Sequence, residues 1–104
     1  MSAIIRRKAH FKIIRFYYNA AKKWKHAWSM EDSHRYIDKV HDEAYKVGTQ
    51  LPTKKDSVLY KWKNYKVAYS KKTGWYFAFR IVDDTIYIED AENYRNMSKA
   101  SVNL

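Results

Sequence analysis

Large apolar side chains recur at every second position through the C-terminal half of this chain, between Tyr65 and Arg95. A period of two residues is typical of a β-strand that buries one face. The pattern predicts three consecutive antiparallel strands. Their shared apolar face would consist of Tyr65, Val67, Tyr69, Trp75, Phe77, Phe79, Ile81, Ile86 and Ile88.

Two polar segments separate these strands. The first, Ser70–Gly74, is polar and ends in glycine, so it predicts a hairpin loop. The second is the pair Asp83 and Asp84, which fits a two-residue turn although it lacks the favoured glycine. The opposite, polar face of the predicted sheet would gather Lys66, Tyr76, Arg80, Tyr87 and Glu89.

These turns also predict the strand register. If Val82 faces Thr85 and Tyr69 faces Trp75, both hairpins place the polar residues of their paired strands on the same side of the sheet. Residues that are directly opposite then form a row across three strands, and this row consists of Lys66, Ala78 and Glu89.

The N-terminal half has a helical period. Apolar residues recur three or four positions apart from Ala9 to Trp28 and again from Ser29 to Val47, which predicts two helices. The first helix would bury Ile14, Tyr17, Ala21, Trp24 and Trp28, and the second would bury Tyr36, Ile37, Val40, Ala44 and Val47. Ser29 and Asp32 have the spacing of a capping box, and Gly48 is suited to end the second helix.

The order of elements predicts one α+β domain over residues 1–104. A strand at Ala3–Ile5 and the helix hairpin would pack on a mainly antiparallel sheet of about four strands. The loop Thr49–Asp56 would lead to a strand at Val58–Trp62.

Composition narrows the classes of function. The formal net charge is +10, with eight basic and no acidic residues in 1–28, and six basic and no acidic residues in 59–82. Two such segments favour contact with a polyanion, with a merely solvated surface as the alternative. The chain contains no cysteine and no apolar run of membrane-spanning length. We therefore expect a cytoplasmic protein that makes no contact with a membrane.

The histidines do not suggest a metal site. His10 and His26 would lie at opposite ends of the first predicted helix, and His34 and His41 are seven residues apart. No cluster has zinc spacing, and two glycines are too few for a nucleotide-binding loop. We expect neither a metal nor a small-molecule cofactor.

The ordered set of Asn64-Tyr65-Lys66-Val67, Gly74-Trp75-Tyr76 and the segment Arg80–Arg95 resembles the RelE/ParE superfamily of bacterial toxins. The resemblance extends to the order of elements over nearly the whole chain. It implies a small, basic, cytosolic toxin that a cognate antitoxin protein neutralises. RelE-like members cleave mRNA in the ribosomal A site by promoting attack of a ribose 2′-hydroxyl on the adjacent phosphate. ParE-like members inhibit DNA gyrase without a known nuclease reaction.

The resemblance assigns roles to particular residues. Lys66 falls where RelE-like enzymes carry a basic residue, and Arg95 falls where they carry an arginine that contacts phosphate. Tyr94 falls where several branches have an aromatic residue or histidine. Ala68 and Tyr76 depart from the pattern, because these positions often hold lysine and arginine. Arg80 could supply the missing positive charge.

Catalysis of this reaction needs cations beside the phosphorane, a base for the 2′-hydroxyl and an acid for the leaving oxygen. We expect Lys66, Arg80 and Arg95 to stabilise phosphate, Glu89 to act as base, and Tyr94 to stack or transfer a proton. Further RNA contacts are expected from bases stacked on tyrosines and from phosphates near lysines. These residues are Tyr76, Tyr87, Lys22, Lys23, Lys61 and Lys63.

Structural roles are the alternative for each of these residues. Lys66 and Glu89 could form a cross-strand ion pair, Arg80 could stack on Tyr87, and the lysines could be solvated. The leading hypothesis is a RelE-like, ribosome-dependent mRNA endonuclease. The alternatives are a ParE-like gyrase inhibitor and an inactive basic module that binds RNA or protein.

Overall fold

The computed structural model describes residues 2–24, 27–54 and 62–96, and it has the expected α+β architecture. The elements follow the order β1 (Ser2–Ile5), α1 (Arg7–Lys23), α2 (Met30–Ala44), β2 (Thr53–Lys54), β3 (Lys66–Ser70), β4 (Trp75–Val82) and β5 (Thr85–Asn93). The sheet order is β1-β5-β4-β3-β2, with β1 parallel to β5 and the other pairs antiparallel. The predicted fold class is therefore confirmed.

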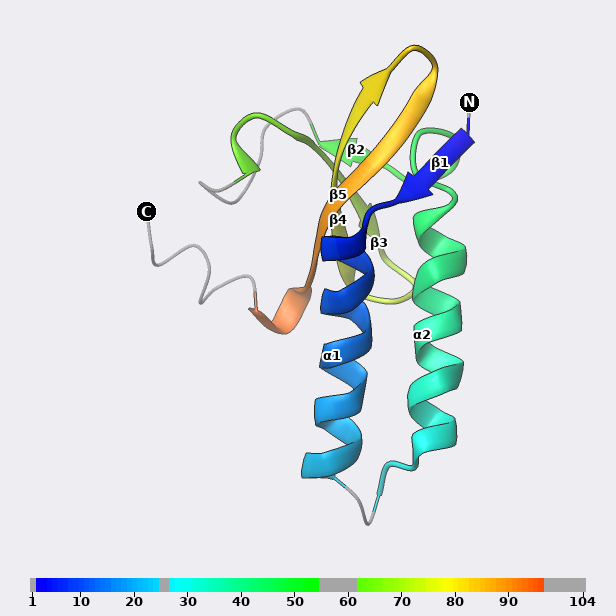
Figure 1. The fold of residues 1–104 in the computed structure, drawn as a ribbon, viewed down its shortest axis with the longest axis vertical. Coiled ribbons are helices and arrows are strands. Elements are labelled where there is room, and N and C mark those ends of the chain that lie inside the picture. Colours follow the sequence, from blue (N-terminus) through cyan, green and yellow to red (C-terminus); the bar gives the residue numbers. More distant parts are fainter. Residues whose placement is uncertain (1, 25–26, 55–61, 97–104) are drawn as a thin grey trace.

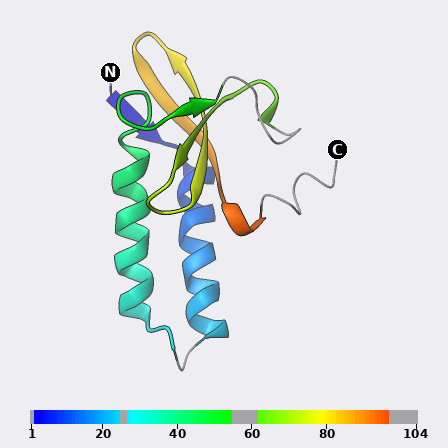
Figure 2. The same ribbon diagram turned by 180° about the vertical axis from the view of Figure 1, so that it is seen from behind.

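The two helices form a hairpin that extends beyond one end of the sheet, as Figures 1 and 2 show from opposite sides. Helix α1 packs along β5, and α2 packs beside α1. The far half of the hairpin therefore stands clear of the strands. The β3–β4 loop and the turn that follows β5 lie at this end of the sheet, next to the hairpin.

Helix α1 is stabilised by its contacts with β5 and α2 more than by capping interactions at its N-terminus. Its N-cap, Arg6, makes no side-chain capping bond, and the first turn has no acidic residue. Instead, the Arg6 N–H donates to the carbonyl of Ile88 at 2.9 Å, which continues the pairing of β1 with β5. Lys22 and Lys23 lie in the last turn, where positive charge favours the helix dipole.

The first helix is shorter than predicted. It ends at Lys23, and the next residue, Trp24, is 56% exposed although the apolar stripe had placed it in the core. The buried stripe is Ala9, Ile13, Tyr17 and Ala21. Ile14 and Trp28 only pack against the core from its edge.

Helix α2 begins where the sequence predicts, but it ends at Ala44 with Tyr45 as its C-cap, three residues before the predicted end at Val47 and the predicted cap at Gly48. The Ser29 hydroxyl accepts from the Asp32 N–H at 3.1 Å, and Asp32 accepts from the Ser29 N–H at 2.9 Å, so the predicted capping box is confirmed. Its core residues include Ile37, Val40 and Ala44. Tyr36, also expected in the core, is 38% exposed.

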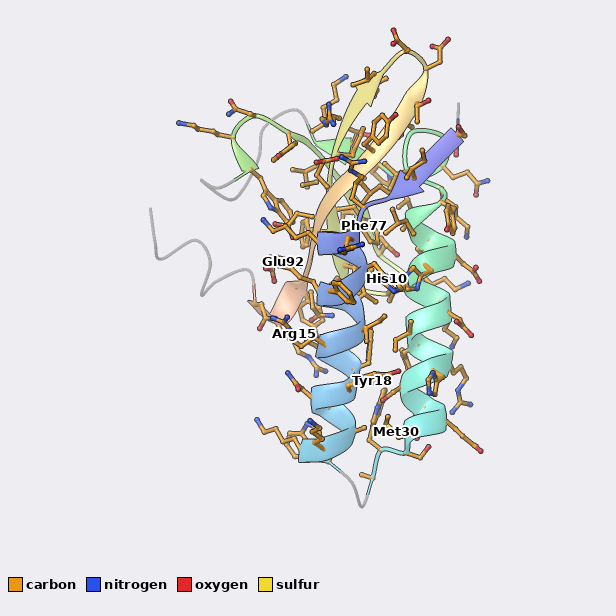
Figure 3. All side chains as sticks on the ribbon, in the orientation of Figure 1. His10, Arg15, Tyr18, Met30, Phe77 and Glu92 are labelled. Carbon is orange, nitrogen blue, oxygen red and sulfur yellow. The ribbon has the colours of Figure 1, made fainter. Side chains whose placement is uncertain are left out.

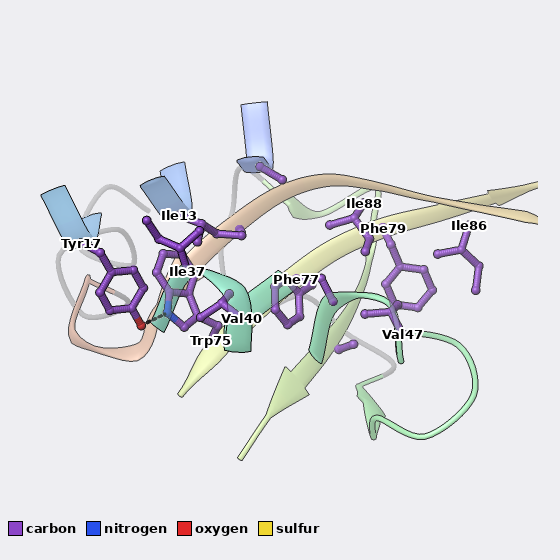
Figure 4. Close-up of a cluster of buried hydrophobic side chains, with 14 residues drawn as sticks. Ile13, Tyr17, Ile37, Val40, Val47, Trp75, Phe77, Phe79, Ile86 and Ile88 are labelled. Atoms are coloured by element: carbon purple, nitrogen blue, oxygen red, sulfur yellow. Dashed lines mark hydrogen bonds between the residues drawn. The ribbon is translucent and has the colours of Figure 1, made fainter. Parts of the chain in front are cut away.

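The main core lies between the helices and one face of the sheet (Figure 4). Its largest fully buried side chains are Trp75, Phe77, Phe79, Ile13, Ile86 and Ile88. At one end, the Trp75 indole N–H donates to the Tyr17 hydroxyl at 2.9 Å, which joins α1 to the start of β4. A smaller cluster of Trp62, Val67 and Ala78 covers part of the opposite face.

The face assignment of β3 was wrong. Ala68 belongs to the main core, whereas Val67 lies in the smaller cluster on the other face. Tyr69 pairs with Tyr76, and Ser70 pairs with Trp75, so the hairpin is one residue out of the predicted register. Because side chains alternate, a shift of one residue exchanges the two faces.

A β-bulge changes the register of the other hairpin. Val82 pairs with Thr85 and Arg80 with Tyr87 as predicted, but the register shifts between Phe79 and Ala78. Ala78 then faces Asp90, and Lys66 faces Phe79. The predicted row of Lys66, Ala78 and Glu89 therefore does not exist.

The two predicted turns are present. Asp83 and Asp84 have φ angles of 49° and 64°, as a type I′ turn requires. The predicted strand at Val58–Trp62 falls largely on residues 55–61, which lie outside the described residues, and so does Lys61. Within the predicted loop Thr49–Asp56, the structure places the short strand β2.

Candidate functional site

Four residues form an arginine–tyrosine cluster on the sheet face that points away from the main core: Arg6, Arg80, Tyr87 and Glu89. The guanidinium carbons of Arg6 and Arg80 lie 5.3 and 5.1 Å from the centre of the Tyr87 ring. Oε1 of Glu89 lies 3.2 Å from Nε of Arg6 and 3.5 Å from Nε of Arg80. Two cations thus contact both a π-face and a carboxylate.

The β-bulge places Glu89 in this cluster. Ile88 pairs with Phe79 and Asp90 pairs with Ala78, so Glu89 is the extra residue between the two pairs. A bulge redirects side chains at such a position. The Glu89 side chain is 20% exposed, and its Oε1 atom is buried without a well-aligned hydrogen bond within the described residues. A carboxylate oxygen in this state can still accept a proton or a hydrogen bond.

A recess of about 330 Å³ adjoins the arginine–tyrosine cluster. It is lined by two cations, two aromatic rings and two carboxylates: Arg6, Lys8, Trp62, Tyr65, Glu89 and Asp90. The site is therefore concave and combines groups that bind anions with groups that accept protons.

Asp90 anchors one wall of this recess. Its carboxylate accepts from the Trp62 indole N–H at 2.9 Å, and it lies 3.0 Å from Nζ of Lys12 and 3.5 Å from Nζ of Lys8. Burial raises the pKa of Asp90, but the bond from Trp62 and the charge of Lys12 outweigh it, so the pKa lies below its ordinary value. Asp90 is therefore a fixed negative charge.

Lys12 joins this wall to the next part of β5. Its ammonium also donates to Glu92 at 2.7 Å, on the side of α1 that faces away from α2 (Figure 3). Burial lowers the pKa of Lys12, but its bonds to Glu92 and Asp90 raise it by more, so the pKa lies above its ordinary value. Lys8 and Lys12 of α1 thus neutralise Asp90 and Glu92 of β5.

Tyr94 and Arg95 lie at the opposite end of β5 from Arg80. Arg80 and Trp75, which pairs with Asn93, are five residues apart on β4, or about 17 Å at the rise of a strand. The Tyr94 ring lies over Gly74, and the Tyr94 N–H donates to the Gly74 carbonyl at 2.8 Å. These residues cannot contact the same phosphate as Arg80.

Lys66 does not join the arginine–tyrosine cluster. It pairs with Phe79, whose side chain faces the helices, whereas Arg80 and Glu89 face the other way. Within the described residues, the ion pairs of Glu89 are with Arg6 and Arg80. The predicted contact between Lys66 and Glu89 is therefore wrong, because the bulge and the shifted hairpin register separate them.

The other predicted RNA contacts are dispersed. The Tyr76 ring lies 4.5 Å from that of Tyr69 and packs against the smaller apolar cluster. Lys63 lies in the turn between Trp62 and Tyr65. Lys22 and Lys23 lie at the end of α1, far along the hairpin from β5's start.

Sequence reasoning missed Arg6, Lys8 and Lys12. Their basic character is visible in the sequence, but their contact with β5 depends on the parallel pairing of β1 with β5. A local sequence pattern does not predict the pairing of two strands that are as far apart in the chain as β1 and β5.

A histidine pair was also missed. Nδ1 of His10 on α1 and Nε2 of His41 on α2 are 2.9 Å apart. Burial, followed by the proximity of His41, lowers the pKa of His10. Within the described residues, no three histidine, cysteine or acidic side chains come together as a metal site.

Comparison of the chain with protein-family models, with curated proteins and with solved structures gave no match. In the parts of the chain that the structure describes, no helix combines the length and the apolar character that crossing a membrane requires.

Proposed function

We propose that this protein is the toxin of a type II toxin–antitoxin pair and a RelE-like, ribosome-dependent mRNA endonuclease of the cytoplasm. The observation that carries the proposal is the position of Glu89, whose buried Oε1 lies between Arg6 and Arg80 beside a recess. The net charge of +10 and the order of elements also support it. Its partners would be mRNA, the ribosome and a cognate antitoxin.

The arrangement suits cleavage by an internal nucleophile. Glu89 accepts the proton of a ribose 2′-hydroxyl, and the 2′-oxygen attacks the adjacent phosphorus. The bond to the 5′-oxygen breaks, a 2′,3′-cyclic phosphate forms, and Lys8 protonates the leaving oxygen. Arg6 and Arg80 stabilise the additional negative charge of the phosphorane, where a cation contributes more than in the ground state.

Tyr87 gives this site its geometry. Because both guanidinium groups lie against its ring, Tyr87 helps to hold them beside Glu89. Bidentate, permanently charged arginine suits contact with phosphate oxygens. The recess beside them is bounded by Trp62, which is buried in the smaller cluster, and by the partly buried Tyr65, whose ring is the one available to an unpaired base.

The test is translation of a defined mRNA in a bacterial cell-free extract, with mapping of new RNA 5′ ends. The wild-type protein should stop translation and produce cuts, and Glu89→Gln and Arg80→Gln should reduce cutting about 100-fold or more. Arg35→Gln is the matched control, because Arg35 pairs with Asp32 on α2, away from the recess. Cleavage at the wild-type level by a folded Glu89→Gln protein would refute the proposed mechanism.

A gyrase inhibitor of the ParE-like type is the second candidate. The observation that favours it is the separation of Lys66, Arg80 and Arg95, which the resemblance to RelE-like enzymes would place around one phosphate. Brief induction in bacteria separates the two functions. An immediate fall in methionine incorporation supports the endonuclease, and an early fall in thymidine incorporation supports gyrase as the target.

A further inference from the structure

A second concave site lies about 17 Å along the sheet from the arginine–tyrosine cluster. It is a groove of about 540 Å³ between the second half of α1, the start of α2, the β3–β4 loop and the turn after β5. Pockets of this size hold ligands as large as a nucleotide. We call it the aromatic groove.

Closely packed rings form the wall of the aromatic groove. The ring centres of Tyr17 and Trp28 are 6.2 Å apart, and the planes are within 13° of parallel. Tyr36 lies 5.7 Å from Tyr17 and 4.9 Å from Trp28. The Tyr17 hydroxyl is fixed by the bond from Trp75. The wall is therefore rigid and presents π-faces.

Two further rings remain open to a ligand. Trp24 is 56% exposed and Tyr94 is 52% exposed, and both line the aromatic groove. Large exposed rings at a concave site usually mark binding. Gly74 permits this position of Tyr94, because a Cβ atom at residue 74 would lie 2.7 Å from Cδ1 of Tyr94.

Each exposed ring carries a cation. Nζ of Lys23 lies 5.3 Å from the centre of the Trp24 ring, and the Arg95 guanidinium carbon lies 5.6 Å from that of Tyr94. Nε of Arg95 donates to the Tyr94 hydroxyl at 3.2 Å, and within the part of the chain that the structure describes its two Nη groups remain for a ligand. The Arg95 backbone N–H donates to Asn93 at 3.1 Å and fixes the turn.

The remaining polar lining is neutral. It consists of amide and hydroxyl side chains, and among the described residues that line the aromatic groove there is no acidic side chain. These polar residues are Asn19, Asn93, Asn96 and Thr73. Rings, amides and two cations without a carboxylate are complementary to a base attached to a phosphate.

We propose that the aromatic groove binds one nucleotide of single-stranded RNA, with the base stacked on Tyr94 or Trp24 and the phosphate held by Arg95 and Lys23. This inference deepens the proposed function, on which it rests for the identity of the nucleic acid. Asn93 in the aromatic groove is four residues along β5 from Glu89, or about 13 Å, so the bound nucleotide is not the one that is cleaved. Arg95 is then a binding residue for a neighbouring nucleotide and does not act at the scissile phosphate.

The test measures binding without cleavage. The probe is a short fluorescein-labelled RNA in which every 2′-hydroxyl is methylated, so that no internal nucleophile remains. Anisotropy titration should show a loss of affinity of about tenfold or more for Tyr94→Leu and for Arg95→Gln, since stacking and phosphate contacts are each worth this much. Arg35→Gln should bind like the wild-type protein.

Competition experiments identify the ligand chemistry. Adenosine monophosphate should displace the probe at lower concentration than adenosine or inorganic phosphate. Equal displacement by inorganic phosphate would show an anion site without a base and overturn the proposal. Stronger displacement by an acidic peptide would show a protein partner instead and would also overturn it.

The same variants separate this inference from the proposed function. If Tyr94→Leu and Arg95→Gln bind the methylated RNA normally while Glu89→Gln abolishes mRNA cutting, the aromatic groove is not the site and the endonuclease stands. If the groove variants lose RNA affinity while no protein cuts mRNA, the groove binds RNA and the endonuclease proposal fails.

Discussion

His10 and His41 share one hydrogen bond across the helix hairpin, with Nδ1 of His10 2.9 Å from Nε2 of His41. His41 also lies 2.8 Å from the Ile37 carbonyl through its Nδ1 atom. A carbonyl only accepts, so Nδ1 of His41 carries a proton and its Nε2 is left to accept from His10. The pair is thus satisfied when both rings are neutral, and it holds α1 against α2.

This pair predicts that stability falls in mild acid. The pKa of His10 is lowered below its ordinary value of 6.5 in the folded protein, so the unfolded chain binds the proton more readily. The stabilising effect is complete above that ordinary value and is lost as the pH falls through the lower, folded-state pKa. The midpoint of urea unfolding should therefore fall between about pH 7.5 and about pH 5.

His10→Gln is the variant that tests this assignment. Glutamine can donate to His41 but does not titrate, so the decrease in urea midpoint over this range should become smaller. His34→Gln, on the same helix as His41, is the control and should retain the wild-type decrease. An unchanged decrease in His10→Gln would assign the pH dependence to another group.

Local signals were reliable where a few neighbouring residues determine the structure. The capping box of Ser29 and Asp32 and the turn at Asp83 and Asp84 were both predictable, since each depends on four residues or fewer. The general α+β order followed from the two hydrophobic periods. Boundaries were less accurate, because the end of α1 at Lys23 is not marked by glycine or proline.

The candidate site was predictable only in part. Arg80 and Tyr87 are neighbours because a short turn determines their register. Glu89 reaches them through a bulge, and Arg6 reaches them through the pairing of β1 with β5. Both features depend on packing between distant segments, and a period of two residues contains no information about either.

Asp90 should be one of the most sensitive positions for folding. Asp90→Asn keeps the shape but removes the charge that pairs with Lys8 and Lys12, so that Glu92 is the acidic partner of Lys12 that remains within the described residues. Because Asp90 is only 3% exposed, we expect a loss of about 2–3 kcal/mol in the free energy of unfolding. Chemical denaturation measures this loss, and Asp38→Asn on α2 serves as the control. A loss below about 0.5 kcal/mol would mean that these ion pairs contribute little.

A substitution in the turn at Asp83 and Asp84 should increase the stability of the protein. Both residues have positive φ, which costs energy for any side chain, and glycine is favoured at the second position of a type I′ turn. Asp84→Gly should therefore raise the free energy of unfolding by about 0.5–1 kcal/mol. Asp84→Val, which introduces a β-branched residue at the same φ, should lower it, and thermal unfolding of the two variants side by side would reveal the opposite signs.

Gly48 should not tolerate a side chain. Its φ is 88°, and an added Cβ atom would overlap with Cδ1 of Ile86, which is fully buried in the main core. Gly48→Ala should lower the free energy of unfolding by about 2 kcal/mol, because backbone strain and overpacking add. The combined variant Gly48→Ala with Ile86→Val creates space for the new atom, so part of the loss should be recovered in the same denaturation experiment. No recovery would attribute the whole effect to the backbone.

Arg6 provides the sharpest test of the arginine–tyrosine cluster, because nothing in its local sequence marks it as functional. It contacts the Tyr87 ring at 5.3 Å and Glu89 at 3.2 Å, which is as close as the contacts of Arg80. Arg6→Gln should therefore reduce mRNA cutting by a factor similar to that of Arg80→Gln, about 100-fold. Arg7→Gln makes the same change in charge one residue along the chain and should cut normally. If Arg6→Gln and Arg7→Gln have equal effects, only the overall charge matters, and the assignment of Arg6 to the site is wrong.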